Sequence, residues 1–474
     1  MNPDPAERAL RPWRILIWAM LAAPVVVALA TPRYFPAGHV LDLVGSYSAL
    51  AKSEFGSSVY RLGMLALALT ATGVIAVWGR RTPDGSRRAL LWGGAALSGT
   101  LALSALLGSR PGFAPGLVVW PLLFVCLAVL PAPPSGQLFA LLRRGLRALA
   151  LLSIAFALLL PAWAFEREYA SGWFQWWSWR LYGAMPHPNF LGPLMLLALL
   201  LELHLLCIAR PAGLLARAAA LAWPAAVLGV LLATQSKTTM LAAAIAVPLL
   251  LVLWANRAAG PRLDARIRLA AGAWGIAMLV CLAALFSGSL ASWADDLADA
   301  KGDSVTTLTG RTVIWNITLD EWRRNPWFGD GPGLWDAEMQ DRYEAELSWR
   351  TGHAHNQVVQ QLGQSGVFGL LAWIAYLGVI VWTLWRSPPR HRPLGWSILA
   401  MIVLGTISEP WFSRGMPGWG PVLLLCHLAL GAGSVSEDAR CADASDGKVG
   451  DPPQPQALPG PPRIGTTLVD QPGR

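Results

Sequence analysis

Charged side chains are scarce in this sequence of 474 residues: Asp, Glu, Lys and Arg make up 14%, whereas 54% of the residues are hydrophobic. Soluble domains carry about a quarter of charged residues, so this scarcity excludes an ordinary soluble protein. Cysteine is also rare, with five residues and no paired spacing, which excludes a disulfide framework or a zinc site. No repeated motif relates the two halves, which disfavours a transporter built on inverted repeats.

Hydrophobic runs long enough to cross a bilayer recur along the chain. They lie near 13–30, 60–78, 88–108, 114–131, 146–165, 185–208, 215–233, 238–255, 268–289, 363–385, 394–409 and 417–434. The sequence therefore predicts an all-α polytopic membrane protein with about twelve transmembrane helices, whose solvent is the lipid bilayer.

Basic residues predict the orientation of these helices. With a cytoplasmic N-terminus, the cytoplasmic segments hold most of the Lys and Arg residues near the spans, as the positive-inside rule requires. The net charge of +9 thus reflects topology, and no basic patch with interleaved aromatics indicates a nucleic-acid partner. Ala28-Leu29-Ala30 resembles a signal-peptidase site, but Pro32 follows closely, so we expect the first span to be retained.

Three polar motifs open predicted helices on the same, external face. They are His187-Pro188-Asn189, Ser236-Lys237 and His355-Asn356. Helix N-termini favour negative charge, so their convergence would suit an anion such as a pyrophosphate. Lys237 adds a full positive charge there, although an interfacial lysine that only extends to water would look the same.

The longest external segment contains a predicted amphipathic helix over Gly310–Trp322, which Asn325-Pro326 ends. Arg311 heads that helix, and a guanidinium is well suited to phosphate oxygens, although an inconsequential surface arginine is an alternative. The loop Gly329–Gly333 lacks the Lys-Ser/Thr of a phosphate-binding loop, so we interpret it as a turn that sets local shape.

His355 is a candidate general base, because an imidazole at a helix N-terminus is biased towards its neutral form. A satisfied interface histidine is the alternative, and His353, two residues away, is placed to orient or to replace it. Glu409, Glu166 and Glu168 are candidate acids near the same face, and nothing in their spacing selects one.

These residues resemble the O-antigen ligase and polymerase superfamily of bacterial membrane glycosyltransferases. Its ligase branch carries His, then Asn, Ser or Gln, nine residues, Gly, two residues, and Gly, Thr or Tyr; here His355-Asn356 precedes Gly366 and Gly369 at that spacing. The stretch with Gly310, Arg311 and Trp315, the following Pro326 and Gly329-x-Gly331, and His187-Pro188-Asn189 are also similar to the family pattern.

The resemblance implies an inverting transferase on the periplasmic side of the bacterial inner membrane, with neither metal nor cofactor. Its donor is an undecaprenyl-pyrophosphate-linked glycan, and its acceptor is lipid A core or a growing glycan. His355 would deprotonate the acceptor hydroxyl, and Arg311 and Lys237 would hold the pyrophosphate; relatives usually have Arg where this chain has Lys237. We expect four residues to support them: His353, Asn356, His187 and Asn189.

The implied organisation has four parts: transmembrane helices one to nine in 1–290, a large, partly helical periplasmic loop in 291–355, helices ten to twelve in 356–434, and a disordered cytoplasmic tail in 435–474. Lipopolysaccharide ligation is favoured weakly over O-antigen or exopolysaccharide polymerisation and over transfer to a protein hydroxyl. A metal-dependent oligosaccharyltransferase is disfavoured because Asp42-Leu43-Val44 lacks the second acid of an Asp-x-Asp motif. A polysaccharide or lipid transporter remains the non-enzymatic alternative.

Overall fold

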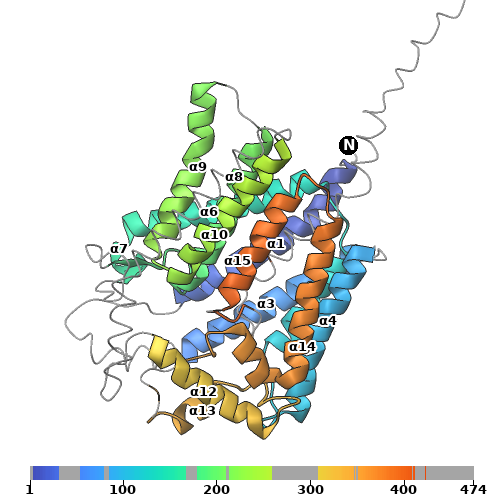
Figure 1. Cartoon of the computed structure of the whole chain (residues 1–474), viewed down its shortest axis with the longest axis vertical. Helices are drawn as coiled ribbons and strands as arrows, with labels where there is room; N and C mark the ends of the chain where they lie inside the picture. The colour runs from blue at the N-terminus through green and yellow to red at the C-terminus, as the bar shows by residue number, and fades with distance from the viewer. Residues whose placement is uncertain are drawn as a thin grey trace, which may run out of the picture. The chain divides into compact units, whose positions relative to one another are not determined.

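The computed structural model describes residues 4–30, 54–79, 85–166, 179–209, 213–258, 308–345, 347, 351–407, 409–411 and 422. The described part of the chain is mostly helical, with one two-stranded antiparallel sheet (Figure 1). Its elements are α1 (Pro5–Ala30), α3 (Glu54–Trp78), α4 (Gly85–Leu107), α5 (Gly116–Val129), α6 (Ser135–Leu159), α7 (Pro161–Ala164), β1 (Phe165–Glu166), β2 (Arg180–Leu181), α8 (Pro188–Ala209), α9 (Leu214–Ala233), α10 (Lys237–Ala258), α12 (Leu308–Arg324), α13 (Ala337–Arg342), α14 (Gln357–Arg386) and α15 (Arg392–Thr406).

Seven of the described helices are long and apolar enough to cross a membrane, and two more are shorter and apolar. The seven lie in α1, α3, α4, α8, α9, α10 and α14, and the shorter ones are α5 and α15. The chain is therefore a polytopic helical membrane protein. The count of about twelve helices stays a prediction, since the expected spans at 268–289 and 417–434 and the expected tail at 435–474 lie outside the described residues.

The predicted fifth span, 146–165, has the wrong bounds. The helix α6 begins eleven residues earlier, at Ser135, and ends at Leu159, where α7 and β1 follow. Arg143, Arg144 and Arg147, which the positive-inside rule counts as residues of a cytoplasmic segment, therefore lie within a helix. The charge of Arg147 is stabilised within the helix because its guanidinium donates to both carboxylate oxygens of Glu202 on α8, at 2.5 and 2.7 Å.

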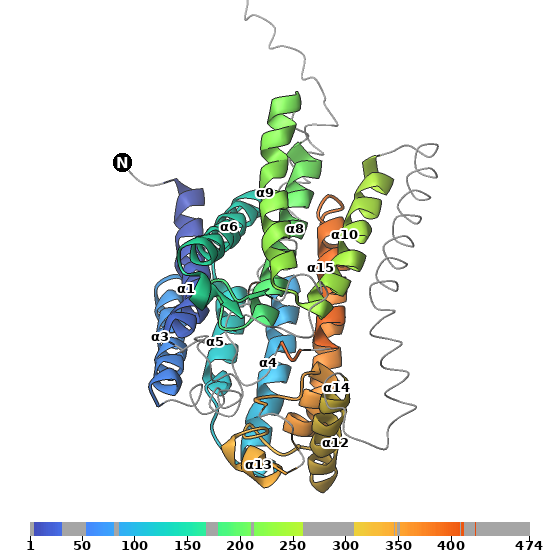
Figure 2. The same cartoon turned by 90° about the vertical axis from the view of Figure 1, so that its left-hand side faces the viewer.

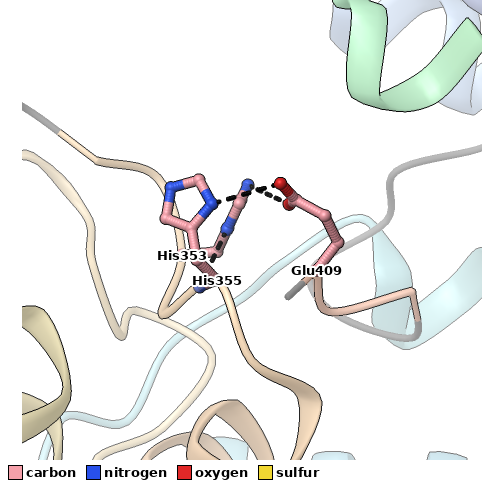
Figure 3. A group of neighbouring side chains, drawn as sticks. All are labelled: His353, His355 and Glu409. Carbon is pink, nitrogen blue, oxygen red and sulfur yellow. Dashed lines mark hydrogen bonds and ion pairs between the residues drawn. The ribbon is translucent and has the colours of Figure 1, made fainter. Parts of the chain in front are cut away.

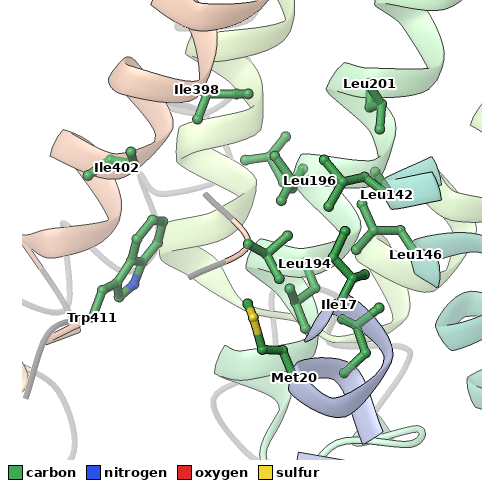
Figure 4. Packing of buried hydrophobic residues seen from close by; sticks show 14 of the residues in the cluster. Ile17, Met20, Leu142, Leu146, Leu194, Leu196, Leu201, Ile398, Ile402 and Trp411 are labelled. Atoms are coloured by element: carbon green, nitrogen blue, oxygen red, sulfur yellow. The ribbon is translucent and has the colours of Figure 1, made fainter. Parts of the chain in front are cut away.

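One hydrophobic core joins the helices of the membrane bundle. Side chains from α1, α6, α8 and α15 interlock in it, as Figure 4 shows for Ile17, Leu146, Leu194 and Ile398. Trp411, which follows α15, packs against this core and against Gly405, where an added Cβ would lie 2.2 Å from its ring. The bundle thus fixes the chain that carries residue 409.

A second, smaller core lies under α12 and α13. It contains Ile314 and Ile317 of α12, Trp335 and Met339 around α13, and Ala354. The helix α12 confirms the amphipathic helix predicted over Gly310–Trp322. Figure 2 shows α12 and α13 beside one end of α14, so this core ties the loop that carries residues 353–355 to that end.

The helix α14 is broken at Gly366, where the backbone has a φ of 66°. A Cβ at this position would lie 2.3 Å from the backbone carbonyl of Trp327, so both the conformation and the space require glycine. The glycine that ends the nine-residue spacing of the motif is therefore structural, and it lets the loop after α12 approach the helix.

The segment 326–331 takes over the backbone hydrogen bonds that the break leaves open. Buried backbone groups need partners, and here another loop supplies them on both sides of Gly366. The bonds run from the N–H groups of Asp330 and Gly331 to the carbonyls of Gly363 and Gln364, at 2.7 and 3.1 Å, and from the N–H of Val367 to the carbonyl of Pro326, at 2.8 Å.

Arg110, just beyond α4, anchors the same loop. Its Nε lies 2.9 Å from Asp330 Oδ2, and its Nη1 lies 3.2 Å from Asp336 Oδ1. Gly329 and Gly331 both have a positive φ, so the predicted turn that sets local shape is confirmed. The turn connects α4, α12 and α14. This rigid joint sets the position of the first turn of α14.

Candidate active site

Glu409 lies at the centre of a polar cluster contributed by three separate parts of the chain. Its side chain is buried, with the residue 5% exposed. Oε1 accepts a hydrogen bond from Nδ2 of Asn189, at 2.7 Å, and lies 3.3 Å from Nδ1 of His355. Oε2 lies 3.7 Å from Nε2 of His353. Figure 3 shows both imidazoles facing the carboxylate.

The surroundings of Glu409 keep its carboxylate ionised. Burial alone would raise its pKa, but the charge of protonated His355 and its hydrogen bond, with the charges of protonated His353 and of Arg311, lower the pKa well below the usual range. An ionised carboxylate only accepts hydrogen bonds, so each nitrogen bonded to it must carry a proton.

The loop before α14 is folded so that His355 faces this carboxylate. His355 has a φ of 50°, uncommon for a residue with a side chain, and its N–H donates to Nδ1 of His353 at 3.2 Å. Asn356 then caps α14: its Oδ1 accepts from the N–H groups of Val358 and Val359, and its Nδ2 donates to the carbonyl of Ile407 at 3.0 Å. Asn356 thereby ties the helix start to the chain just before Glu409.

These contacts assign the tautomers of both histidines. His355 donates from Nδ1 to the ionised Glu409, so in the neutral form of His355 the lone pair lies on Nε2. His353 accepts a backbone N–H at Nδ1, so its proton lies on Nε2 and faces Oε2 of Glu409. In its neutral form, His355 therefore directs one ring N–H at a carboxylate and has its second ring nitrogen unprotonated, as in catalytic triads.

His187 and Asn189 begin α8 on the other side of Glu409. The Nδ1 of His187 accepts the backbone N–H of Asn189 at 3.1 Å, so His187 caps the helix. Its pKa is lowered to about 3, first by burial and then by the charge of Arg180, so it stays neutral. Asn189 accepts from Nη2 of Arg180 at 2.6 Å, which turns its amide N–H₂ towards Glu409.

The two expected phosphate ligands lie at the edge of this cluster. Lys237 is the first residue of α10, and its neighbours Ser236 and Thr238 line the same cavity as Glu409. Arg311, in the first turn of α12, contributes to the lowered pKa of Glu409. No hydrogen bond or ion pair joins Lys237 or Arg311 to another side chain in the described part of the chain.

A metal ion would find three potential ligands here, because ligand atoms of His353, His355 and Glu409 lie within 4.8 Å of one another. A histidine that ligates a metal normally donates its second ring N–H to an acceptor. The second nitrogen of His353 instead faces a backbone N–H and must accept from it. The donor set therefore fits a hydrogen-bonded cluster better than a metal centre.

The structure identifies the acid of the candidate site, which the sequence did not single out. His187, Asn189, His353, His355 and Asn356 all meet around Glu409, whereas Glu409 was only one of three candidate acids. Glu166 lies in β1, 4.0 Å from Arg180, and Glu168 lies outside the described residues. Arg180, nine residues before Asn189, was not predicted, because its burial is a signal that the sequence does not carry.

The comparisons with known proteins found one match, to a segment that contributes several residues of this cluster. Residues 224–374, about a third of the chain, match a family model described as O-antigen ligase, and the match includes Lys237, Arg311, His353 and His355. No curated protein matches the chain. The resemblance to the O-antigen ligase family that the motifs indicated is confirmed for this segment of the membrane protein.

Proposed function

We propose that the protein transfers a glycan from undecaprenyl pyrophosphate to an acceptor hydroxyl at the periplasmic face of the inner membrane, as an O-antigen ligase with lipid A core as acceptor. The observation that carries this proposal is the pairing of His355 with the buried, ionised Glu409. Such a pair fixes the N–H of the neutral imidazole on the carboxylate and leaves its second ring nitrogen unprotonated, as general-base catalysis needs.

In the proposed reaction, Nε2 of His355 removes the proton of the acceptor hydroxyl as its oxygen attacks the anomeric carbon of the donor. The bond from that carbon to the pyrophosphate oxygen breaks, and undecaprenyl pyrophosphate leaves with the bonding electrons. A single displacement of this kind inverts the configuration. The imidazolium formed is stabilised by Glu409, and no step requires a metal ion.

Negative charge grows on the departing pyrophosphate, so groups that bind it more tightly in the transition state accelerate the reaction. Arg311 and Lys237 are the cations available for this role, and the N-terminus of α10 adds a favourable dipole at Lys237. Lysine supplies a point charge without the two-pronged geometry of arginine. We therefore assign the larger share of pyrophosphate binding to Arg311.

The membrane spans support a lipid-linked donor. A polyprenyl chain partitions into the bilayer, and a site at the N-termini of apolar helices meets its head group at the membrane surface. The positive-inside rule supports the periplasmic side for this surface.

The experiment that tests the proposal supplies purified protein in lipid with an undecaprenyl-pyrophosphate oligosaccharide, with and without lipid A core, and follows the glycan by mass. Transfer to lipid A core is the expected result. A ladder of longer lipid-linked glycans without lipid A core would instead indicate a polymerase. Movement of an unchanged donor across the bilayer, with neither product, would indicate a transporter and contradict the proposal.

A further inference from the structure

An exposed aromatic patch lies where the chain leaves α12. The segment 326–328, the aromatic corner, carries Trp327, which is 59% exposed. The centroid of its ring lies 5.7 Å from that of Phe368 on α14, which is 41% exposed, and the ring of Phe328 lies 5.5 Å from that of Phe368. Single exposed apolar side chains are common, but a contiguous patch of them marks an interaction surface.

The patch continues along one side of α14 after its break at Gly366. Exposed apolar residues recur on this side at helical spacing, whereas the opposite side of the helix is buried in the core of the bundle. The exposed residues are Phe368, Leu371, Ile374, Val381 and Trp385. Because α14 is one of the membrane spans, its outward side contacts lipid acyl chains, and the aromatic corner adjoins this lipid-facing side.

The length of the lipid-facing side places the aromatic corner at a membrane surface. The rise from Phe368 to Trp385 is about 26 Å in an α-helix, close to the bilayer's hydrocarbon thickness of about 30 Å. At the far end, the guanidinium of Arg386 lies 4.4 Å from the ring centroid of Trp382, a pairing typical of a membrane–water interface. Trp327 and Phe368 therefore lie where the aromatic belt of the opposite interface is expected.

The aromatic corner is suited to an apolar environment because its three residues are uncharged and its backbone is hydrogen-bonded to α14. The carbonyl of Pro326 accepts the N–H of Val367 at 2.8 Å. The carbonyl of Trp327 accepts the N–H of Phe368 at 3.4 Å. Carbonyls that are paired within the protein do not need water, which is the condition for placing a loop against lipid.

Asn325 fixes the aromatic corner to the end of α4. Its Nδ2 donates to the carbonyl of Leu107 at 2.8 Å, and its Oδ1 accepts the N–H of Phe328 at 3.3 Å. Leu106 and Leu107 are themselves 73% and 51% exposed, so the end of α4 extends the apolar patch. The corner is thus held in place by two membrane helices before it meets any partner.

We propose that the aromatic corner inserts into the membrane–water interface beside Phe368 and anchors α12 to the bilayer. The partner is the lipid itself, whose acyl chains pack against the rings of Trp327 and Phe368 just below the head groups. From this anchor, α12 runs about 20 Å back from Arg324 to Arg311, which lies near Glu409. The loop expected to lie in the periplasm is therefore tethered to the membrane surface at one end of α12.

The test introduces a photoreactive side chain into the full-length protein in phosphatidylcholine nanodiscs. p-Benzoylphenylalanine, which reacts with nearby C–H bonds on irradiation, replaces Trp327, Leu371 or Glu338 in separate samples. Leu371, 55% exposed on the lipid-facing side of α14, is the reference for lipid contact. Glu338, with its side chain 71% exposed on α13, is the control outside the patch. Lipid adducts are quantified by mass spectrometry of proteolytic peptides.

We expect lipid adducts at position 327 to be at least about tenfold more abundant than at position 338 and within about threefold of those at position 371. A yield at 327 closer to that at 338 than to that at 371 would overturn the anchor. A crosslink from 327 to a second copy of the chain in place of lipid would also overturn it, in favour of a protein interface. Should the variant at 327 fail to fold, replacement of Phe368, the other ring of the pair, is judged by the same comparison.

Discussion

Replacing Glu409 by Gln removes the charge at the centre of the site while it preserves the shape. Oε1 of Glu409 is the oxygen that receives both Asn189 and His355, at 2.7 and 3.3 Å. The amide oxygen of Gln can occupy that place and keep both hydrogen bonds. The amide N–H₂ then lies at the position of Oε2, 3.7 Å from Nε2 of His353 and beyond hydrogen-bonding distance of it. We therefore expect Glu409→Gln to fold.

The expected loss of activity follows from the lost charge. Two unit charges about 4 Å apart attract by about 4 kcal/mol at an effective dielectric constant of about 20. This attraction is present only after His355 has taken the proton, so losing the attraction raises the activation barrier of the transfer. Each 1.36 kcal/mol added to the barrier slows the reaction about tenfold. Since water and neighbouring dipoles offset part of it, we expect kcat to fall by about 10²–10³-fold.

The assay is single-turnover transfer from an undecaprenyl-pyrophosphate oligosaccharide in lipid nanodiscs, with thermal unfolding measured on the same samples. Glu338→Gln is the matched control: its carboxylate is 71% exposed and is paired with Arg342 four residues along α13. We expect the control to keep the rate of the parent. Transfer by folded Glu409→Gln within about threefold of the parent would refute a role for the carboxylate in stabilising the imidazolium.

Three further predictions concern stability. Gly366→Ala should destabilise the fold by more than about 2 kcal/mol, because alanine tolerates neither the positive φ nor the contact with the 327 carbonyl, whereas Gly378→Ala, with open space around it in the same helix, should be neutral or slightly stabilising in thermal unfolding. Asn356→Ala should cost about 1 kcal/mol or more through the lost cap of α14, and the exposed Asn316→Ala much less. The pKa of His187 is lowered from 6.5 to about 3, so as the pH falls the unfolded chain binds a proton at this residue before the folded chain does. The unfolding temperature should therefore drop between about pH 6.5 and 3. The variant His187→Gln should show a smaller drop, and an unchanged pH profile in this variant would contradict the prediction.

Helix positions were predictable where hydrophobic runs meet clear start signals. The spans expected at 215–233 and 238–255 appear as α9 and α10 with nearly the same bounds, because the turn at 234–236 interrupts continuous apolar sequence. The start of α6 was missed because its arginines suggest a loop in the sequence, and only the fold reveals that Arg147 has Glu202 as a partner 55 residues away.

The candidate site was predictable in part, for a related reason. The motif indicated His355 and the helix starts, because local patterns of capping residues carry that information. The selection of Glu409 needed contacts across 54 residues to His355 and 220 residues to Asn189, which no local pattern contains. The sequence likewise contains a glycine at position 366, but the helix breaks there because the segment 326–331, distant along the sequence, supplies hydrogen-bond partners on both sides of the glycine.

The most direct test of the central claim measures donor affinity and single-turnover transfer together for the parent and for His355→Ala. A general base acts on the acceptor and makes little contribution to donor binding, so we expect transfer to fall by about 10²–10⁴-fold while the Kd for undecaprenyl-pyrophosphate oligosaccharide stays within about threefold. Transfer by folded His355→Ala at the rate of the parent, or a loss explained entirely by weaker donor binding, would contradict the assignment of His355 as the base.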